Sequence, residues 1–459
     1  MLKLYNSLSQ EKEVFQPLEP GKVKMYVCGM TVYDYCHLGH MRMLTAFDVI
    51  VRYLRFLNYE VTYVRNITDV DDKIIKRANE NQEDYSHLAE RFIRAMQEDI
   101  HALGLVAPNQ EPRATEFIPQ MIALIEKLVQ KGYAYQAENG DVFFNVRRFP
   151  HYGCLSHRDI DELESGARVE INDVKKDPLD FVLWKMAKPG EPAWVSPWGN
   201  GRPGWHIECS AMAMALLNEQ FDIHGGGKDL IFPHHENEIA QAEAASGKKF
   251  VKVWMHNGYV QINKEKMSKS LGNFLTIRDL LAQYPAEAIR YFLISSHYRS
   301  QLQFSDAAIP QAHQALERFY IALRDLPPAT AVKDSPFEFR FIEAMNDDFN
   351  TPVALSVLFE LAHAIQKLRD KDLPQAAAHG ALLRHLGGVL GILQSKSKDF
   401  LQTTAKVDRE LVMQLIADRE AARAQKNWSE ADRLRAKLTE LSIVVEDGPE
   451  GTTWRYEVK

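Results

Sequence analysis

The feature that most constrains the fold is a strand, helix and strand pattern within residues 23–67. The apolar run "VKMYV" predicts a short buried strand, and "HMRMLTAFDVIVRYLRFLNY" has its apolar residues at helical spacing. The β-branched stretch "EVTYVRNI" then predicts a second strand. Two strands joined by a crossover helix pair in parallel by default, so we expect an α/β fold with a Rossmann-like parallel sheet. The turn "CHLGH" lies at the sheet edge where such folds bind ligands.

The rest of the chain divides into further units. Helical patterns and a predicted hairpin, with Asn139-Gly140 as its turn, interrupt the sheet and indicate an insertion at about residues 84–200. Alternating helices and strands then return, followed by an almost wholly helical region. We therefore expect a first α/β domain at residues 1–300, a helical bundle at residues 301–394 and a small C-terminal domain at residues 401–459.

Composition excludes several classes of protein. No apolar run is long enough to span a bilayer, and the N-terminus lacks the features of a signal or transit peptide, so we expect a cytoplasmic protein without membrane contact. Four cysteines are too few for a disulfide framework and indicate a reducing compartment. The formal net charge of −7 argues against a broadly basic surface for nucleic acid, although a local binding site remains compatible with it.

Two short motifs far apart in the chain suit the binding of phosphate. His37, Gly39 and His40 lie in "HLGH" at a predicted helix start, where free N–H groups and the helix dipole attract anions. Lys266 and Lys269 lie in "KEKMSKSLGN", a glycine-containing stretch without a regular period that predicts a loop able to close on a polyanion. The alternatives are ordinary polar residues at a helix start and a solvated surface loop.

A third motif, "PHHENE" at residues 233–238, offers metal ligands. His234 and Glu238 are spaced i,i+4 and His235 and Glu238 i,i+3, so sequence spacing does not choose between the two histidines. Cys28 at the end of the first predicted strand and Cys209 at another predicted helix start supply thiols for a zinc site. The alternative is a histidine pair that caps a helix.

The order and spacing of "HLGH" and "KMSKS" resemble those of class I aminoacyl-tRNA synthetases. Other blocks resemble the cysteinyl-tRNA synthetases in particular, and the resemblance runs in order from residue 1 to residue 459. These blocks are "PGKVKMYVCGMTVYD", "VRNITDVDDKI", "GRPGWHIECS", "GGKDLIFPHHENEIAQ", "KMSKSLGN", "MNDDFNTPVALSVLFEL" and "GPEGTTWR".

The resemblance implies one zinc ion per chain at the floor of a cysteine pocket, with Cys28, Cys209, His234 and Glu238 as its ligands. It leaves His235 as a neighbour without an assigned role, while Cys36 and Cys154 are expected to be small buried side chains. Zinc prefers a thiolate to a hydroxyl, so it would distinguish cysteine from serine better than pocket shape does. Four protein ligands normally close a zinc site, and Glu238, the oxygen donor, is the expected weak ligand.

The resemblance also implies the reaction. L-cysteine and ATP, with Mg²⁺, would form cysteinyl-adenylate, and a terminal ribose hydroxyl of tRNA(Cys) would then accept the cysteine. His37, His40, Lys266 and Lys269 would stabilise phosphate charge, and Gly39 would allow close approach of ATP. Trp205 is expected as a wall of the pocket, and Thr68 and Asp229 as contacts to amino or ribose groups. For these three residues a core tryptophan and capping polar side chains are the alternatives.

The C-terminal third is expected to read the tRNA. The stretch "YPAEAIRYFLI" at residues 284–294 resembles the start of the helical anticodon-binding bundle of related synthetases. Residues 401–459 contain nearly equal numbers of basic and acidic side chains, so recognition there must be local. Trp454 and Arg455 are the predicted anticodon contacts, because aromatic stacking is a usual way to read single-stranded RNA. A packed core tryptophan is the alternative, and a monomer is expected.

Two rival functions differ from this one by specific features. A ligase that passes cysteine from the adenylate to a small amine would not need the C-terminal portion that ends in "GTTWR". A non-catalytic zinc-binding regulatory protein would not need both "HLGH" and "KMSKS".

Overall fold

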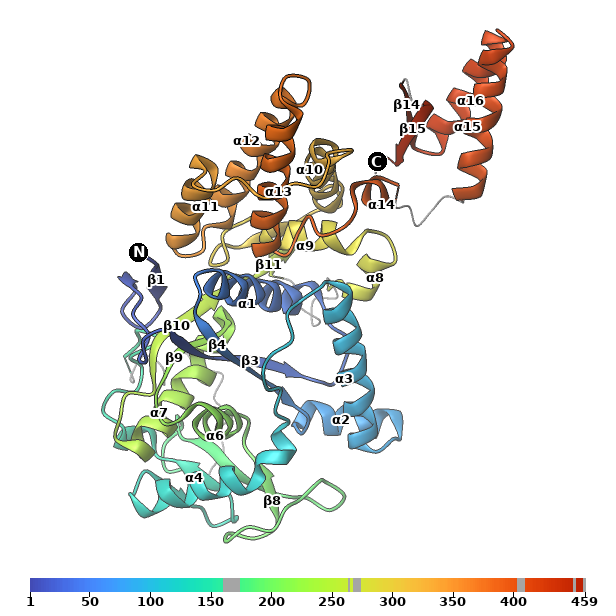
Figure 1. Ribbon diagram of the computed structural model, residues 1–459. Coiled ribbons are helices and arrows are strands. Elements are labelled where there is room, and N and C mark those ends of the chain that lie inside the picture. The colour runs from blue at the N-terminus through green and yellow to red at the C-terminus, as the bar shows by residue number, and fades with distance from the viewer. Residues whose placement is uncertain (160–173, 263–264, 267–273, 403–408, 449–450, 457–459) are drawn as a thin grey trace.

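The computed structural model describes residues 1–159, 174–262, 265–266, 274–402, 409–448 and 451–456. Its centre is a parallel sheet of four strands in the order β10-β9-β3-β4 (Figure 1). The crossover from β3 to β4 is helix α1, which confirms the strand, helix and strand pattern and the Rossmann-like class predicted from the sequence. The elements are β3 (Lys22–Thr31), α1 (Leu38–Phe56), β4 (Glu60–Thr68), β9 (Phe221–Gly227) and β10 (Val251–Asn257).

Helices cover both faces of this sheet, and alternation along the strands decides which side chain meets which helix. Met25 and Val27 belong to the apolar core that contains the side chains of α1, whereas Tyr26 and Cys28 belong to the core on the opposite face. That opposite core contains side chains of α6 (Trp205–Leu217) and α7 (Glu236–Ser246), which lie below the sheet in Figure 1. The period of two therefore turns Cys28 toward α6.

The insertion contributes a second, antiparallel sheet in the order β5-β6-β7-β8. Its first hairpin has the predicted turn, with Gly140 at a φ of 92°. The insertion begins later than about residue 84, because side chains of α3 pack in the core beside α1 and residues 110 and 113 bridge to β4 in parallel. The elements are α2 (Asp72–Asn81), α3 (Tyr85–Ala102), α4 (Ile118–Gln130), β5 (Ala134–Gln136), β6 (Val142–Phe144), β7 (Phe181–Met186) and β8 (Gly201–Pro203).

After β10 the chain forms a small sheet in the order β12-β11-β13 and then becomes helical. Helices α9 to α13 lie above α1 in Figure 1. The elements are β11 (Val260–Ile262), β12 (Glu265–Lys266), α8 (Ile277–Leu281), α9 (Ala286–Ile294), β13 (Leu302–Phe304), α10 (Ala308–Leu323), α11 (Pro336–Asn346), α12 (Thr351–Arg369), α13 (Leu373–Val389) and α14 (Ser397–Leu401).

Two small units complete the fold. An N-terminal hairpin of β1 (Lys3–Asn6) and β2 (Glu11–Val14) lies beside β10. At the other end a pair of helices and a hairpin share their own apolar core. These elements are α15 (Arg409–Ala424), α16 (Trp428–Glu440), β14 (Ile443–Gly448) and β15 (Gly451–Tyr456).

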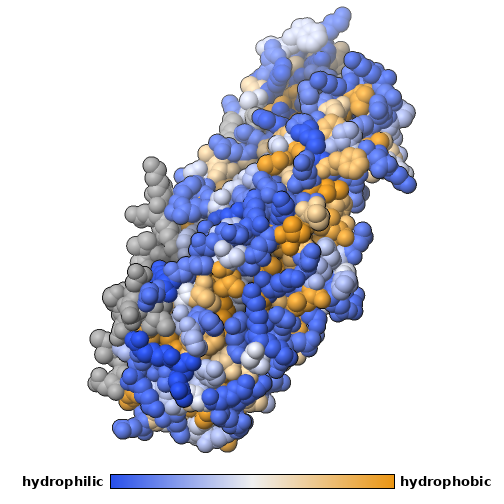
Figure 2. Space-filling view, turned by 90° about the vertical axis from the view of Figure 1, so that its left-hand side faces the viewer, coloured by the Kyte–Doolittle hydropathy of each residue, from blue (hydrophilic) through white to orange (hydrophobic). Residues whose placement is uncertain are grey.

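The surface of the elongated molecule is mainly hydrophilic on the face that Figure 2 shows, and hydrophobic side chains gather along its middle. Among the described residues, no helix has both the length and the apolar character needed to cross a membrane.

Candidate functional site

Two thiols from distant parts of the chain meet beneath the central sheet. Cys28 lies in β3 where the register with β4 shifts between Val27 and Met30, and irregularities of this kind redirect side chains. The next residue must be glycine, because a Cβ on Gly29 would lie 1.6 Å from the carbonyl oxygen of Asn66. Cys209 lies in the first turns of α6, and its Sγ is 3.7 Å from Cys28 Sγ. Both side chains are buried.

His234 and Glu238 complete a set of four donors. Helix α7 begins at Glu236, and shortly before it the backbone is extended at Phe232, with a φ of −134° and a ψ of 131°. His234 Nε2 still lies 3.1 Å from Glu238 Oε1, which is itself 3.5 Å from Cys28 Sγ. The donor atoms of Cys28, Cys209, His234 and Glu238 all lie within 4.8 Å of one another. Two sulfurs, a ring nitrogen and a carboxylate oxygen are the donor types that zinc takes in proteins, so the set fits this ion.

A second set of donors shares two members with the first. It consists of Cys28, His224, His235 and Glu238, again within 4.8 Å. His235 Nε2 lies 3.3 Å from Cys28 Sγ, and His224 Nε2 lies 2.8 Å from Glu238 Oε2. Sequence spacing did not choose between His234 and His235, and in the structure both reach the cluster of sulfur and carboxylate donors.

Further histidines surround the donors and were not predicted from the sequence. His206 Nδ1 lies 3.0 Å from His234 Nδ1, and His256 Nε2 lies 2.8 Å from His235 Nδ1. Partners of this kind orient metal-binding imidazoles. Their place in the predicted elements was the one signal that could have pointed to them. His224 and His256 each lie in a strand of the parallel sheet, and His206 lies in the first turn of α6, next to Trp205.

The electrostatics of the cluster favour anionic donors. Burial disfavours a thiolate, but hydrogen bonds with Cys28 and His234 outweigh burial and lower the pKa of Cys209 to about 6. Burial raises the pKa of Cys28 well above its ordinary value, with Cys209 and Glu238 adding to the effect. Burial also opposes ionisation of Glu238, yet His224 and His234 lower the pKa of this carboxyl to about 2. A thiolate and a carboxylate are thus available for a cation.

A cavity of about 780 Å³ opens beside these donors, between the inserted sheet and the edge of the parallel sheet. Trp205 lines it, is 38% exposed, and has its ring centroid 4.4 Å from that of His234. Asp229 lines the same cavity and is exposed. Thr68 is buried and donates its hydroxyl hydrogen to Glu208 Oε2 at 2.9 Å, and Glu208 in turn lines the cavity. Burial raises the pKa of Glu208 well above its ordinary value.

The "HLGH" turn begins α1 as predicted. His37 is the N-cap, its Nδ1 accepts the N–H of His40 at 3.2 Å, and His40 Nδ1 accepts the N–H of His37 at 3.3 Å. The two rings stack with centroids 3.5 Å apart, and Gly39 lies between them in sequence. The alternative reading, polar residues at a helix start, thus also holds: the two histidines cap α1, which fixes both imidazoles at the positive end of the helix.

The chain that follows the lysine motif returns to this turn. The N–H of Leu38 donates to the carbonyl of Leu275 at 3.0 Å, and the N–H of Ile277 donates to the carbonyl of Cys36 at 2.9 Å. The backbone of Lys266 lies in β12, whereas Lys269 lies outside the described residues. The two motifs, more than two hundred residues apart in sequence, are thus joined through the segment immediately after residue 273.

The two residues predicted to contact the anticodon lie in the last hairpin, and both have partners within the chain. Trp454 is 6% exposed and packs in the core of the C-terminal unit, so the packed-core alternative describes it. The guanidinium of Arg455 pairs with Glu317 of α10 and lies 3.6 Å from Glu446. Trp428, at the start of α16, is instead 60% exposed. The sequence did not single it out, because a position at the start of a helix suits a core or a surface residue.

Three family descriptions match successive parts of the chain. Residues 14–314 match the catalytic domain of the class I (C) tRNA synthetases, residues 340–394 match the DALR domain, and residues 410–455 match the cysteinyl-tRNA ligase anticodon binding domain. These matches support neither rival function, because a ligase for small amines and a regulatory zinc protein have no use for an anticodon binding domain.

Known proteins resemble the chain over its whole length. It is 57% identical to a cysteine–tRNA ligase of Coxiella burnetii (strain Dugway 5J108-111), over 99% of this chain and 100% of that protein. It is 59% identical to a cysteine–tRNA ligase of Halorhodospira halophila, over 99% of both chains. A crystal structure of Mycobacterium tuberculosis methionyl-tRNA synthetase bound by methionyl-adenylate shares the fold, with a TM-score of 0.60 and 15% identity over 83% of this chain and 93% of that chain. The chain therefore belongs to the cysteine–tRNA ligase family of class I aminoacyl-tRNA synthetases.

Proposed function

We propose that the protein activates L-cysteine with ATP and Mg²⁺ and transfers it to the 3′ end of tRNA(Cys), with a zinc ion selecting the amino acid. The observation that carries the proposal is the buried meeting of Cys28, Cys209, His234 and Glu238 directly beside a cavity. A structural zinc knuckle is normally remote from a substrate cavity, whereas one of these donors, His234, lies against the ring of Trp205, which lines a cavity.

The proposed ligands are Cys28, Cys209, His234 and Glu238, with one zinc per chain. Zinc bound there supplies a soft Lewis acid that prefers a thiolate to a hydroxyl. Glu238 remains the candidate for the weakest ligand, because its Oε2 has His224 as a second partner at 2.8 Å. A carboxylate with such a partner stays paired when its other oxygen moves away from an ion, which lowers the cost of admitting the substrate sulfur.

The side chains around the cavity orient the rest of the amino acid. Trp205 is 38% exposed and so has a ring face available to a substrate. Thr68 and Glu208 form a buried hydrogen-bonded pair, which suits a fixed polar contact with the amino group. Asp229 is an exposed residue that lines the same cavity, and its carboxylate is of the type that accepts hydrogen bonds from ribose hydroxyls.

Two groups of residues stabilise charge on the phosphates. His37 and His40 do so at the start of α1, where the helix dipole is positive and Gly39 lets ATP come close. Lys266 and Lys269 do so from the lysine motif, whose following segment is hydrogen-bonded to the "HLGH" turn. No enzyme nucleophile is required, because the carboxylate of cysteine attacks the α-phosphate and the ribose hydroxyl attacks the resulting adenylate.

Recognition of tRNA(Cys) involves the helical bundle and the C-terminal unit. Trp454 and Arg455 were the predicted contacts, but their packing and ion pairs favour a role in holding the hairpin. Trp428 is the better candidate for stacking on an anticodon base, because its ring is 60% exposed within the stretch that matches an anticodon binding domain. The protein is proposed to act as a monomer in the cytoplasm, a reducing compartment that its four free cysteines suit.

The decisive experiment is cysteine-dependent exchange of pyrophosphate into ATP, followed by charging of unfractionated tRNA. We expect exchange with cysteine and not with serine, and charging of a single tRNA species. Exchange without charging would favour a small-molecule acceptor. Metal binding without exchange would favour a regulatory zinc protein.

A further inference from the structure

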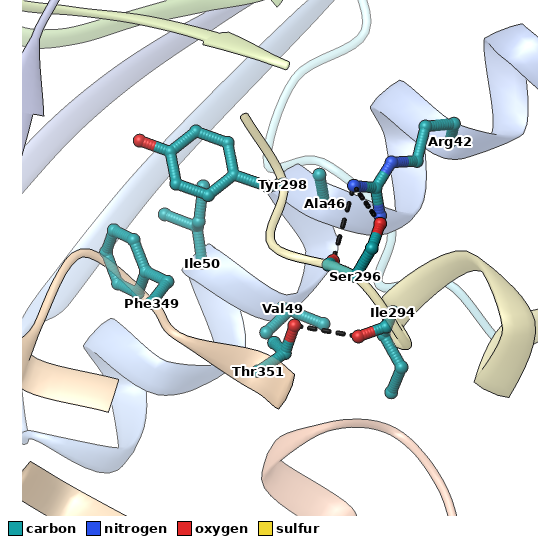
Figure 3. Close-up of a pocket in the computed structure, with 9 residues that line it drawn as sticks. All are labelled: Arg42, Ala46, Val49, Ile50, Ile294, Ser296, Tyr298, Phe349 and Thr351. Atoms are coloured by element: carbon teal, nitrogen blue, oxygen red, sulfur yellow. Dashed lines mark hydrogen bonds between the residues drawn. The ribbon is translucent and has the colours of Figure 1, made fainter. Parts of the chain in front are cut away.

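The loop between α9 and β13, residues 295–301, touches three parts of the molecule and is called here the junction loop. Its first contact is with α1, the helix that begins at the "HLGH" turn. The buried guanidinium of Arg42 donates to the carbonyl and hydroxyl oxygens of Ser296 at 3.3 and 3.1 Å (Figure 3). It also donates to the carbonyl of Leu293 in α9 and to the carbonyl of His297 at 2.7 Å. A cation at the end of α9 is favoured by the dipole of that helix.

The second contact is with the strands that lead to the lysine motif. The N–H of Gly258, just after β10, donates to the carbonyl of Tyr298 at 2.8 Å, and the N–H of Leu302 donates to the carbonyl of Tyr259 at 2.9 Å. A Cβ on Gly258 would lie 2.3 Å from the carbonyl oxygen of Ser300, so only glycine permits this approach. Strand β11 then pairs with β13 in parallel and continues to β12, where Lys266 lies.

The third contact is with the helical bundle, and it is made by one buried carboxylate. Asp348, between α11 and α12, is fully buried. It accepts the hydroxyl hydrogen of Tyr298 at 2.8 Å and pairs with Arg299 Nε at 2.6 Å. His297 Nε2 lies 3.7 Å away, and the N–H of Tyr5 donates to Asp348 Oδ1 at 2.9 Å. A small cavity between α1 and the junction loop is lined by Arg42, Tyr298 and Phe349, among others. Figure 3 shows Tyr298 and Phe349 on the side of this cavity away from Arg42.

We propose that Asp348 is a positioning residue for adenylate formation, which acts through the junction loop to fix the "HLGH" helix relative to the strands that carry the lysine motif. The proposal rests on the proposed role of these two motifs in ATP binding. Asp348 holds the side chains of Tyr298 and Arg299, while the backbone of the same loop holds Arg42 on one side and Gly258 on the other. Misplacement of catalytic groups by a fraction of an ångström lowers the rate of the chemical step.

The test compares two buried carboxylates. Asp348→Asn keeps the size of the side chain but removes the buried negative charge that pairs with Arg299 and accepts the hydroxyl hydrogen of Tyr298. The matched control is Asp222→Asn, near the start of β9 and away from the junction loop. The buried carboxylate of Asp222 accepts the N–H groups of Leu18 and Lys24 at 2.6 and 2.8 Å. Both variants should melt at a lower temperature than the parent.

We expect only Asp348→Asn to change the kinetics, and we expect a fall of about tenfold in kcat of cysteine-dependent pyrophosphate exchange at a temperature where both variants are folded. The KM for cysteine and the zinc content should stay at the parent values, because the zinc donors do not touch the junction loop. A merely structural role would give Asp348→Asn the parent kcat, like the control, and would overturn the proposal.

A milder variant keeps the test decisive if Asp348→Asn does not fold. Arg299→Met removes the partner of Asp348 from a side chain that is 29% exposed, so folding should survive. Arg299→Met should lower kcat, as Asp348→Asn does, without loss of zinc. A folded Arg299→Met protein with the parent kcat contradicts the proposal, as does a loss of kcat accompanied by loss of cysteine affinity. Absence of exchange in the parent protein would instead contradict the proposed function itself.

Discussion

Cys28 Sγ lies 3.7 Å from Cys209 Sγ, although one belongs to strand β3 and the other to helix α6. Neither element offers a metal site by itself, so loss of one sulfur should weaken metal binding by the whole cluster. Cys209→Ser should therefore hold less than one zinc per chain after dialysis against a chelator, and affinity for cysteine should fall with zinc content. Metal analysis of the purified variant measures the first effect, and equilibrium binding the second.

The matched control for this variant is Cys154→Ser. Cys154 is a partly buried thiol that lies 3.6 Å from Glu236 Oε1 and does not belong to either donor set. It should keep one zinc per chain and bind cysteine as the parent does. Full zinc retention by Cys209→Ser would show that the pair of thiols is not the metal site.

Cobalt in place of zinc should report whether the substrate sulfur reaches the metal. Cysteine should change the thiolate-to-metal charge-transfer band, and serine should leave the band unchanged, because a hydroxyl stays protonated and is a poor ligand. Discrimination against serine in pyrophosphate exchange should greatly exceed the roughly 10–200-fold that a pocket reading size or polarity achieves. A spectrum indifferent to cysteine, with metal removal merely unfolding the protein, would make the site structural.

Lys269→Ala tests the lysine motif. A lysine that serves the departing pyrophosphate acts on charge that develops in the transition state, so its loss should lower kcat for exchange more than it raises the KM for ATP. Zinc content should not change. Lys371→Ala, an exposed lysine between α12 and α13, is the control and should behave as the parent. Unchanged exchange in Lys269→Ala would favour the solvated surface loop.

The local spacing of apolar residues predicted most of the fold, because helices and strands have periods that are visible directly in a sequence. The alternation in "VKMYVC" turned Cys28 to the face that α6 covers, and Asn139-Gly140 formed the expected hairpin turn. The histidines around the metal donors could not be predicted in the same way. His224 and His256 reach the cluster only because β3, β9 and β10 pair in one parallel sheet, a fact of tertiary structure.

The burial of the two C-terminal tryptophans could not be predicted from the sequence either. Trp454 lies in a strand and Trp428 at the start of a helix, and either position suits a core or a surface residue. Packing of the hairpin against α15 and α16 decides that Trp454 is buried and Trp428 exposed.

Asp99 should make stability depend on pH. Burial raises its pKa to about 6 from an ordinary 3.8, and Arg278 opposes the shift only in part. A folded pKa above the unfolded value means that the carboxyl contributes stability below about pH 4, which is lost as the pH rises through 6. Asp99→Asn does not ionise, so its Tm should exceed that of the parent at pH 7.5, and the difference should shrink at pH 5.

The control for this prediction is Glu98→Gln. Glu98 also pairs with Arg278, but its side chain is 68% exposed and the carboxylate stays solvated. The Tm of Glu98→Gln should not exceed that of the parent at pH 7.5. A Tm difference for Asp99→Asn that is the same at both pH values would contradict the assignment of the shift to Asp99.

The two tryptophans of the C-terminal unit should fail in different ways when they are replaced. Trp428→Ala should lower kcat/KM for tRNA charging by about 5- to 150-fold, because stacking on one base contributes roughly 1–3 kcal/mol. Pyrophosphate exchange and Tm should stay at the parent values, since the ring is 60% exposed and remote from the zinc donors.

Trp454→Ala should instead destabilise the C-terminal unit, because a large core side chain costs about 3–5 kcal/mol to remove. Thermal melting and tRNA charging measured on both variants decide the matter. Normal charging by Trp428→Ala, together with a charging defect in a fully folded Trp454→Phe protein, would return anticodon recognition to Trp454.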